Sequence, residues 1–160
     1  DHRRIAVSAP SPDLRLVDFD VTLTARIKVR IDKSNHSLFA ARMAPSLSVT
    51  SGGKLLNAGG GEAERGTFGR PASWRDARGA WASETEGLAI FSHPKNPWHP
   101  PPWFTRDYGF FSPTPMWWLE KGFLEFAPGE KLHLRHRVLV HGGAPTPAQL
   151  GVEFEKWSLE

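Results

Sequence analysis

Apolar and polar side chains alternate along residues 17–32. A period of two is that of a β-strand with one buried face, so we expect one long, half-buried strand here. Residues 87–92 form a short apolar run that is typical of a buried strand. Residues 123–126 and 131–141 flank Pro128-Gly129-Glu130, an arrangement that predicts a β-hairpin. The pattern therefore indicates mainly antiparallel strands.

Two intervening segments have weaker patterns. Residues 38–49 mix apolar and polar side chains around Pro45, which predicts a strand that breaks at the proline. Residues 51–70 carry seven of the 15 glycines, so we expect an exposed loop.

The C-terminal segment has the features of a helix start. Thr146 is placed to cap the helix, Pro147 suits its first position, and Gln149 completes a capping box. Apolar residues then recur at helical spacing, at Leu150, Phe154 and Trp157. Antiparallel strands with one short C-terminal helix predict an all-β protein, an antiparallel β-sandwich. It is a single domain over residues 1–160, or half of a larger one.

Composition narrows the class of protein. The chain has 160 residues and a net charge of +3, from 20 basic and 17 acidic residues. This excess is too small to indicate a nucleic-acid partner. No apolar run is long enough to span a membrane, so we expect no membrane partner. The absence of cysteine excludes disulfides and thiolate metal sites, and it leaves the compartment open.

Residues 91–118 stand out from the rest of the chain. They hold nine of the 18 aromatic residues and seven of the 14 prolines, but only three charges. Proline removes backbone donors, so we expect a long loop without a helix or a central strand. A loop this aromatic packs on the body of the protein and presents its polar groups to a ligand. The alternative is a hydrophobic lid that closes one end of the sandwich.

The two histidines of this loop are candidates for chemistry. His93 and His99 lie among prolines, which would hold the imidazole rings at set positions for acid–base work or metal binding. A metal site would need further ligands, with His36 and Asp107 as the candidates. The alternative is that both histidines hydrogen-bond the loop backbone. We assign no cofactor.

Charged and aromatic residues add candidates for binding. Arg106-Asp107 is an ion pair in the least charged part of the chain, so it braces the loop or faces a polar ligand. Arg42 emerges from an apolar setting and suits a carboxylate or a pair of hydroxyls. Tryptophan rings stack on the apolar faces of sugars, and they also fill cores. The tryptophans concerned are Trp98, Trp103, Trp117 and Trp118.

These same segments carry a resemblance to a known family. Residues 35–45, 93–100 and 103–109, with the strings His-Pro-Lys-Asn-Pro and Arg-Asp-Tyr-Gly, resemble the PmoA-like family, and residues 122–143 resemble its closing hairpin. This is a bacterial family of largely unassigned function, labelled after methane oxygenase. The resemblance implies the C-terminal half of a galactose-mutarotase-like sandwich. The missing N-terminal half would then be a partner, and an apolar sheet edge would be exposed.

Three hypotheses of function follow. The first is a carbohydrate-active protein that acts on a glycoside or sugar derivative. Its catalytic residues would be His93, His99 and Asp107, and its binding residues would be Arg42, Arg106, Trp103, Trp98 and His36. The second is a non-catalytic carbohydrate-binding or interaction module that uses the same tryptophans. The third is a histidine-ligated, metal-dependent oxygenase, as the family label suggests.

Overall fold

The computed structural model describes residues 1–35 and 38–160. His36, a candidate binding residue, lies outside this part of the chain. The strands are β1 (His2–Ser11), β2 (Leu14–Thr24), β3 (Val29–Asp32), β4 (Ala41–Arg42), β5 (Lys54–Asn57), β6 (Trp74–Trp81), β7 (Glu84–Ser92), β8 (Trp103–Arg106), β9 (Phe110–Pro113), β10 (Phe123–Phe126) and β11 (Lys131–Gly142). The helices are α1 (Ala63–Thr67) and α2 (Pro147–Ser158), and two 3-10 turns span Pro45–Leu47 and Val49–Ser51.

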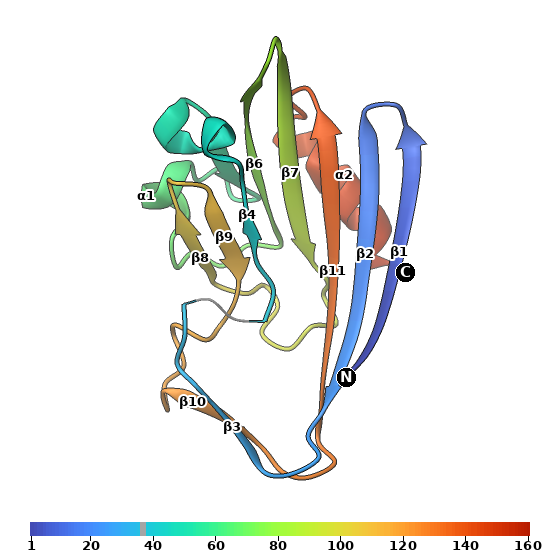
Figure 1. Ribbon diagram of the computed structural model, residues 1–160, viewed down its shortest axis with the longest axis vertical. Helices are drawn as coiled ribbons and strands as arrows, with labels where there is room; N and C mark the ends of the chain where they lie inside the picture. The colour runs from blue at the N-terminus through green and yellow to red at the C-terminus, as the bar shows by residue number, and fades with distance from the viewer. Residues whose placement is uncertain (36–37) are drawn as a thin grey trace.

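A large antiparallel sheet of six strands, in the order β1-β2-β11-β7-β6-β5, forms the centre of the molecule. A small sheet, β4-β9-β8, covers part of one face, and α2 covers the other face (Figure 1). The remaining strands, β3 and β10, pair into a ribbon that curls below the small sheet. These layers confirm the prediction of an antiparallel β-sandwich with a short C-terminal helix.

The large sheet has an apolar core on each face. In β7, Ala89 and Phe91 pack against α2, whereas Leu88 and Ile90 face the small sheet. Successive side chains of a strand point to opposite faces, so a strand buried on both faces is apolar throughout. This explains the short apolar run seen in the sequence. The predicted strand over residues 87–92 is confirmed within β7.

The hairpin predicted around Pro128-Gly129-Glu130 is wrong. β11 pairs with β2, and β10 pairs with β3, so the two segments do not pair with each other. The predicted long strand over residues 17–32 is likewise divided into β2 and β3. Ala25 bridges the break, because its amide donates to the Glu130 carbonyl at 2.9 Å and its carbonyl accepts from Gly129 at 2.8 Å. The turn residues therefore bend a continuous two-stranded pairing instead of reversing the chain.

Three other predictions need correction. Residues 38–49 form only the short strand β4 before the 3-10 turns that begin at Pro45. Residues 51–70 are no plain loop, because they include β5 and α1. Residues 91–118 contain the hairpin of β8 and β9, in which β9 is the central strand of the small sheet. Strands form there because the run of prolines ends at Pro102 and the next proline, Pro113, ends β9.

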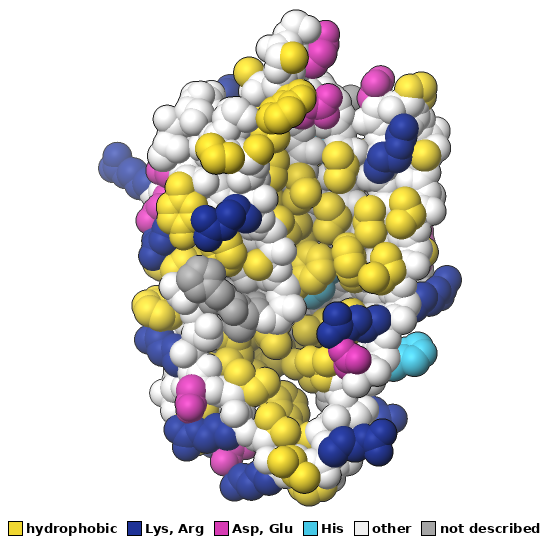
Figure 2. All heavy atoms as spheres, in the orientation of Figure 1, with side chains coloured by type: hydrophobic (Ala, Val, Ile, Leu, Met, Phe, Trp, Pro, Cys, Tyr) yellow, Lys and Arg dark blue, Asp and Glu magenta, His cyan; other side chains and the backbone are white. Residues whose placement is uncertain are grey.

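Part of the large sheet remains uncovered. β1 is an edge strand, and its Ile5 and Val7 are 56% and 69% exposed. Figure 2 shows apolar side chains on the face of the large sheet that the small sheet covers only in part. The edge strand β1 therefore carries exposed apolar side chains. No helix in residues 1–35 and 38–160 is long and apolar enough to cross a membrane.

The helix α2 begins as its sequence indicates. The Gln149 amide donates to Thr146 Oγ1 at 3.2 Å, and the Thr146 amide donates to Gln149 Oε1 at 2.8 Å. These two bonds form the predicted capping box. Leu150 and Trp157 are buried against the large sheet.

Replacing the cap should loosen this helix. Thr146→Ala removes the side-chain acceptor for the Gln149 amide, and we expect it to lower the free energy of unfolding by about 1 kcal/mol. Urea denaturation followed by circular dichroism measures the change. Ser8→Ala, an exposed position in β1, is the matched control. Equal midpoints for the two variants would contradict a stabilising cap.

Candidate functional site

A network of charged side chains lies on the α2 side of the large sheet. Arg137 donates from Nε and Nη2 to the two carboxylate oxygens of Asp18, at 2.6 and 2.8 Å. Next to this pair, Asp20 lies 3.7 Å from Arg135 Nε and 2.7 Å from His133 Nε2. The register of β2 and β11 sets both pairings, because Asp18 faces Arg137 and Asp20 faces Arg135. A small hollow of about 90 Å³ lies between this network and the end of α2.

His93 is fully buried beside this network. Its Nδ1 accepts a hydrogen bond from the Lys95 amide at 3.0 Å, and its Nε2 lies 2.9 Å from Arg135 Nη1. Burial and the positive charge of Arg135 lower the pKa of His93 to about 4. The ring is therefore uncharged at neutral pH, and both of its nitrogens face protein groups. These contacts join residues 91–118 to β11. They agree with the alternative in which His93 hydrogen-bonds the loop backbone.

His99 packs against the C-terminal helix, α2. Its ring stacks on Phe154 of α2, with ring centres 6.1 Å apart and planes 3° apart, and the edge of His93 meets Trp157 at 5.0 Å. Burial lowers the pKa of His99, and its Nδ1 is buried without a partner among the described residues. The structure thus brings His93 and His99 to one helix, where both secure the loop.

Arg106 and Asp107 lie elsewhere, against α1. Arg106 Nη1 donates to Glu64 Oε1 at 2.6 Å, and Asp107 Oδ1 accepts from the Glu64 amide at 2.7 Å. Figure 1 shows α1 beside the small sheet, whereas α2 lies behind the large sheet. The candidate Asp107 is therefore separate from the two histidines. Arg106 therefore pairs with Glu64 and not with Asp107, and of the two interpretations of these residues, bracing is the one that their contacts favour.

The remaining loop candidates are dispersed. Arg42 is exposed in β4, with its guanidinium 5.1 Å from the centre of the Tyr108 ring. Trp103 is fully buried between the two sheets, and its Nε1 donates to the Ala72 carbonyl at 2.8 Å. A ring without exposed area offers no platform for a sugar, so Trp103 belongs to the core.

A buried arginine that the sequence analysis missed packs on Trp103. Arg75 of β6 is fully buried, and its guanidinium lies 5.1 Å from the centre of the Trp103 ring. Its Nη2 donates to the carbonyls of Thr67 and Arg70, both at 2.7 Å. Burial lowers its pKa to about 9. The cation thus ties the end of α1 to the core beneath it.

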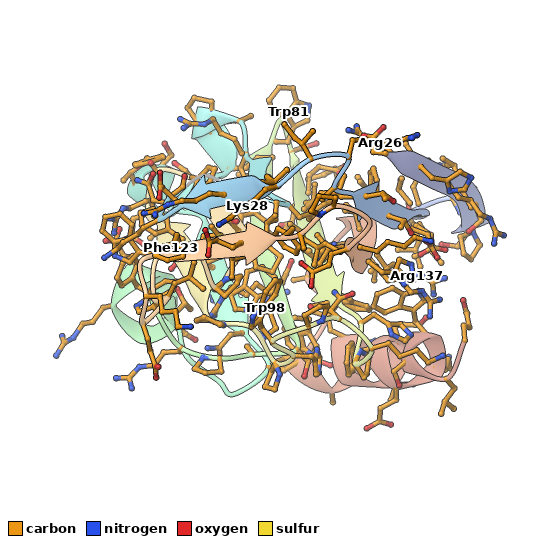
Figure 3. The ribbon with its side chains drawn as sticks, turned by 90° about the horizontal axis from the view of Figure 1, so that it is seen from below. Arg26, Lys28, Trp81, Trp98, Phe123 and Arg137 are labelled. Atoms are coloured by element: carbon orange, nitrogen blue, oxygen red, sulfur yellow. The ribbon has the colours of Figure 1, made fainter. Side chains whose placement is uncertain are left out.

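Trp98 lies in a different environment from Trp103. It lines an open hollow of about 440 Å³ together with Trp118 and Phe123, and Glu120 and Lys121 stand on the rim. Trp98 and Trp118 are half-buried, and the two rim residues are exposed. Figure 3 shows Trp98 and Phe123 near one another in the view from below. The hollow lies between prolines of residues 91–118 and the β3–β10 ribbon, so it exists only in the tertiary structure.

The backbone at Trp98 is also unusual. Its φ is 67°, in the left-handed region that side chains other than glycine rarely adopt. Such a conformation costs about 1–3 kcal/mol, which the surrounding contacts must offset. Across the hollow, Trp118 packs so closely on Gly69 that a Cβ there would lie 3.2 Å from Trp118 Cζ2. The positions of both indole rings are therefore set by the fold.

The sequence analysis also missed a buried pair between distant strands. Asp76 of β6 is fully buried, and its Oδ1 lies 2.9 Å from Nε2 of His141 in β11. In the sequence Asp76 stands between Arg75 and Arg78, and nothing local links it to His141. For metals, residues 1–35 and 38–160 contain no group of three or more histidine and carboxylate side chains that could hold an ion.

The burial of His93 predicts a pH dependence of stability. Its pKa is about 4 in the folded protein against 6.5 ordinarily, so the unfolded chain binds more protons between these values. Stability is therefore lost as the pH falls from 6.5 towards 4. His136 acts in the same direction, since burial lowers its pKa to about 3.

His93→Gln should reduce this dependence. We expect about one proton fewer to be taken up on unfolding near pH 5, measured as the slope of the unfolding free energy against pH. Asn96→Ala loosens the same loop without removing a titratable group, so it should lower stability but keep the slope. An unaltered slope in His93→Gln would contradict the prediction.

Comparison with known proteins gives one family. Residues 1–155 match the sequence model of DUF6807, which is described as a family of unknown function. No curated protein and no solved structure matches the chain. The resemblance to the PmoA-like family stays a prediction. Because the family match covers nearly the whole chain, the protein belongs to the DUF6807 family.

Proposed function

We propose that this protein binds carbohydrate in the hollow lined by Trp98, Trp118 and Phe123. The observation that carries the proposal is the pair of half-buried indole rings in an open hollow with a charged rim, Glu120 and Lys121. Sugars have apolar C–H faces that stack on indole rings, and their hydroxyls need polar partners at the edge of a site. This hollow offers both.

The backbone of Trp98 supports the proposal. A left-handed φ at a bulky residue is costly, and such strain is concentrated at functional sites. Here the conformation places an indole ring on the wall of the hollow, where a core role would not require it. Trp103 differs from Trp98, because the Trp103 ring is fully buried and its N–H is bonded within the core.

The contacts of His93 and Asp107 favour carbohydrate binding without turnover over catalysis. A general acid–base pair needs side chains within hydrogen-bond reach of the substrate. His93 is buried with the Lys95 amide against Nδ1 and Arg135 Nη1 against Nε2, and Asp107 accepts from an amide of α1. A carbohydrate-active enzyme remains the competing proposal, and the formation of a product distinguishes it.

Affinity electrophoresis tests the proposal. The protein is run through native gels that contain xylan, mixed-linkage β-glucan or polygalacturonate, and we expect at least one to retard it. Trp98→Ala and Trp118→Ala should each weaken binding by about tenfold, because a stacking platform is lost. Trp81→Ala is the matched control, since Trp81 is 56% exposed at the β6–β7 turn, away from the hollow (Figure 3).

Three outcomes would contradict the proposal. The first is normal mobility in all three gels. The second is retardation of the Trp98 and Trp118 variants equal to that of the wild type. The third is equal weakening by Trp81→Ala, which would indicate nonspecific adsorption through exposed tryptophan. Release of reducing sugar from a retarding polysaccharide would favour the enzyme instead.

A further inference from the structure

A second hollow lies at the opposite end of the large sheet from the β3–β10 ribbon. The turn between β1 and β2, the end of β11 and the start of α2 surround it, and Figure 1 shows these three segments together at the top of the sheet. Its volume is about 370 Å³, within the range of about 300–1,000 Å³ that is usual for ligand sites. Its walls carry His141, Asp13 and Glu153.

His141 is held in this wall by a buried carboxylate. Its Nε2 lies 2.9 Å from Asp76 Oδ1, and the two side chains are 5% and 0% exposed. The strand between them contributes Gly87, which pairs with His141 across the sheet. A Cβ at Gly87 would lie 2.4 Å from His141 Cε1, so only glycine leaves room for the ring. The fold therefore orients this imidazole with little freedom.

The contact with Asp76 determines the role of each ring nitrogen. A carboxylate can only accept, so Nε2 carries the hydrogen in this contact and Nδ1 is the ring nitrogen left for another partner. This Nδ1 is buried and has no hydrogen-bond partner among the described residues. An unpaired buried acceptor costs about 1–3 kcal/mol, which a ligand donor would recover. His141 is one of the residues that line the hollow, and its Nδ1 is an unpaired nitrogen just beneath that lining.

The charge of Asp76 is compensated from outside the hollow. Arg78 Nη1 lies 3.2 Å from Asp76 Oδ2 and donates to the Pro145 carbonyl at 2.6 Å. The same arginine thus neutralises the carboxylate and ties down the segment after β11 that borders the hollow. The Asp76 carboxylate is therefore already balanced by a residue that does not line the hollow.

The residues that line the hollow make it acidic. Asp13 and Glu153 are its charged carboxylates, and its described lining includes no lysine or arginine. Lys156 pairs with Glu153 at 2.8 Å on the exposed side of α2, and such a surface pair contributes only a few tenths of a kcal/mol. A cation with N–H donors complements this set of groups.

We propose that this hollow binds a small primary ammonium compound. One N–H of the ammonium donates to His141 Nδ1, and Asp13 and Glu153 balance its charge. The site shares no residue with the Trp98 hollow, so this proposal does not depend on carbohydrate binding there. Two sources supply this chemistry, a simple alkylamine and an amino sugar.

Isothermal titration calorimetry at pH 7 tests the proposal with butylamine, glucosamine and N-acetylglucosamine. The first two should bind saturably, and N-acetylglucosamine, which lacks the charge, should bind at least about tenfold more weakly than glucosamine. Equal affinity for butylamine and glucosamine would show that the ammonium group suffices. Tighter binding of glucosamine would identify the ligand as an amino sugar.

Variants assign the effect to the named groups. His141→Gln keeps an N–H towards Asp76 and removes the Nδ1 acceptor, so we expect about a tenfold loss of affinity. Asp13→Asn and Glu153→Gln remove the rim charges and should each weaken binding, and they remain informative if His141→Gln does not fold. Glu155→Gln, exposed on α2 outside the hollow, is the matched control and should bind like the wild type.

The proposal is overturned by any of three results. One is the absence of saturable binding of butylamine and glucosamine to the wild-type protein. Another is unchanged affinity in the two rim variants, or in a folded His141→Gln. The last is equal affinity for glucosamine and its N-acetyl form. Trp98→Ala should leave all of these affinities unchanged, which separates this site from the proposed carbohydrate site.

Discussion

The pairing of β11 with both β2 and β7 is the interaction on which the rest of the structure depends. β11 is twelve residues long and lies between two strands that come from distant parts of the chain. Its register with β2 places Arg135 opposite Asp20, and its register with β7 places His141 opposite Gly87. A slip of one residue would turn every side chain to the other face, so the ion pairs and both cores depend on this alignment.

The two faces of the large sheet differ in how they are completed. On one face, α2 covers the apolar residues that pack against it. Paired arginines and aspartates of β2 and β11 lie on the same face beside the helix. On the other face, the small sheet covers one part and leaves apolar side chains of β1 exposed. Buried charges need partners, which is why the cations of the network meet carboxylates. Arg75 is different, since backbone carbonyls and an indole ring surround it.

Two hollows of different character lie at opposite ends of this framework. The Trp98 hollow is aromatic with a mixed charged rim, whereas the His141 hollow is acidic and contains an oriented imidazole. Each depends on segments that meet only through the fold. A loop and a ribbon form the first, and a turn, a strand end and a helix form the second. The histidines of residues 91–118 take part in neither wall, because they secure the loop to β11 and α2.

The sequence by itself determined the features that local physics decides. Two-residue alternation predicted strands, and the capping box predicted the start of α2, because both depend on neighbouring residues only. Pairing partners were decided by the tertiary structure, so the segments around Pro128 form a bent pairing and not a hairpin. The same reason separates Trp98 from Trp103, since composition does not say which ring is buried. Glu64 with Arg106, and Asp76 with His141, are joined across 42 and 65 residues, a distance at which no sequence pattern specifies contact.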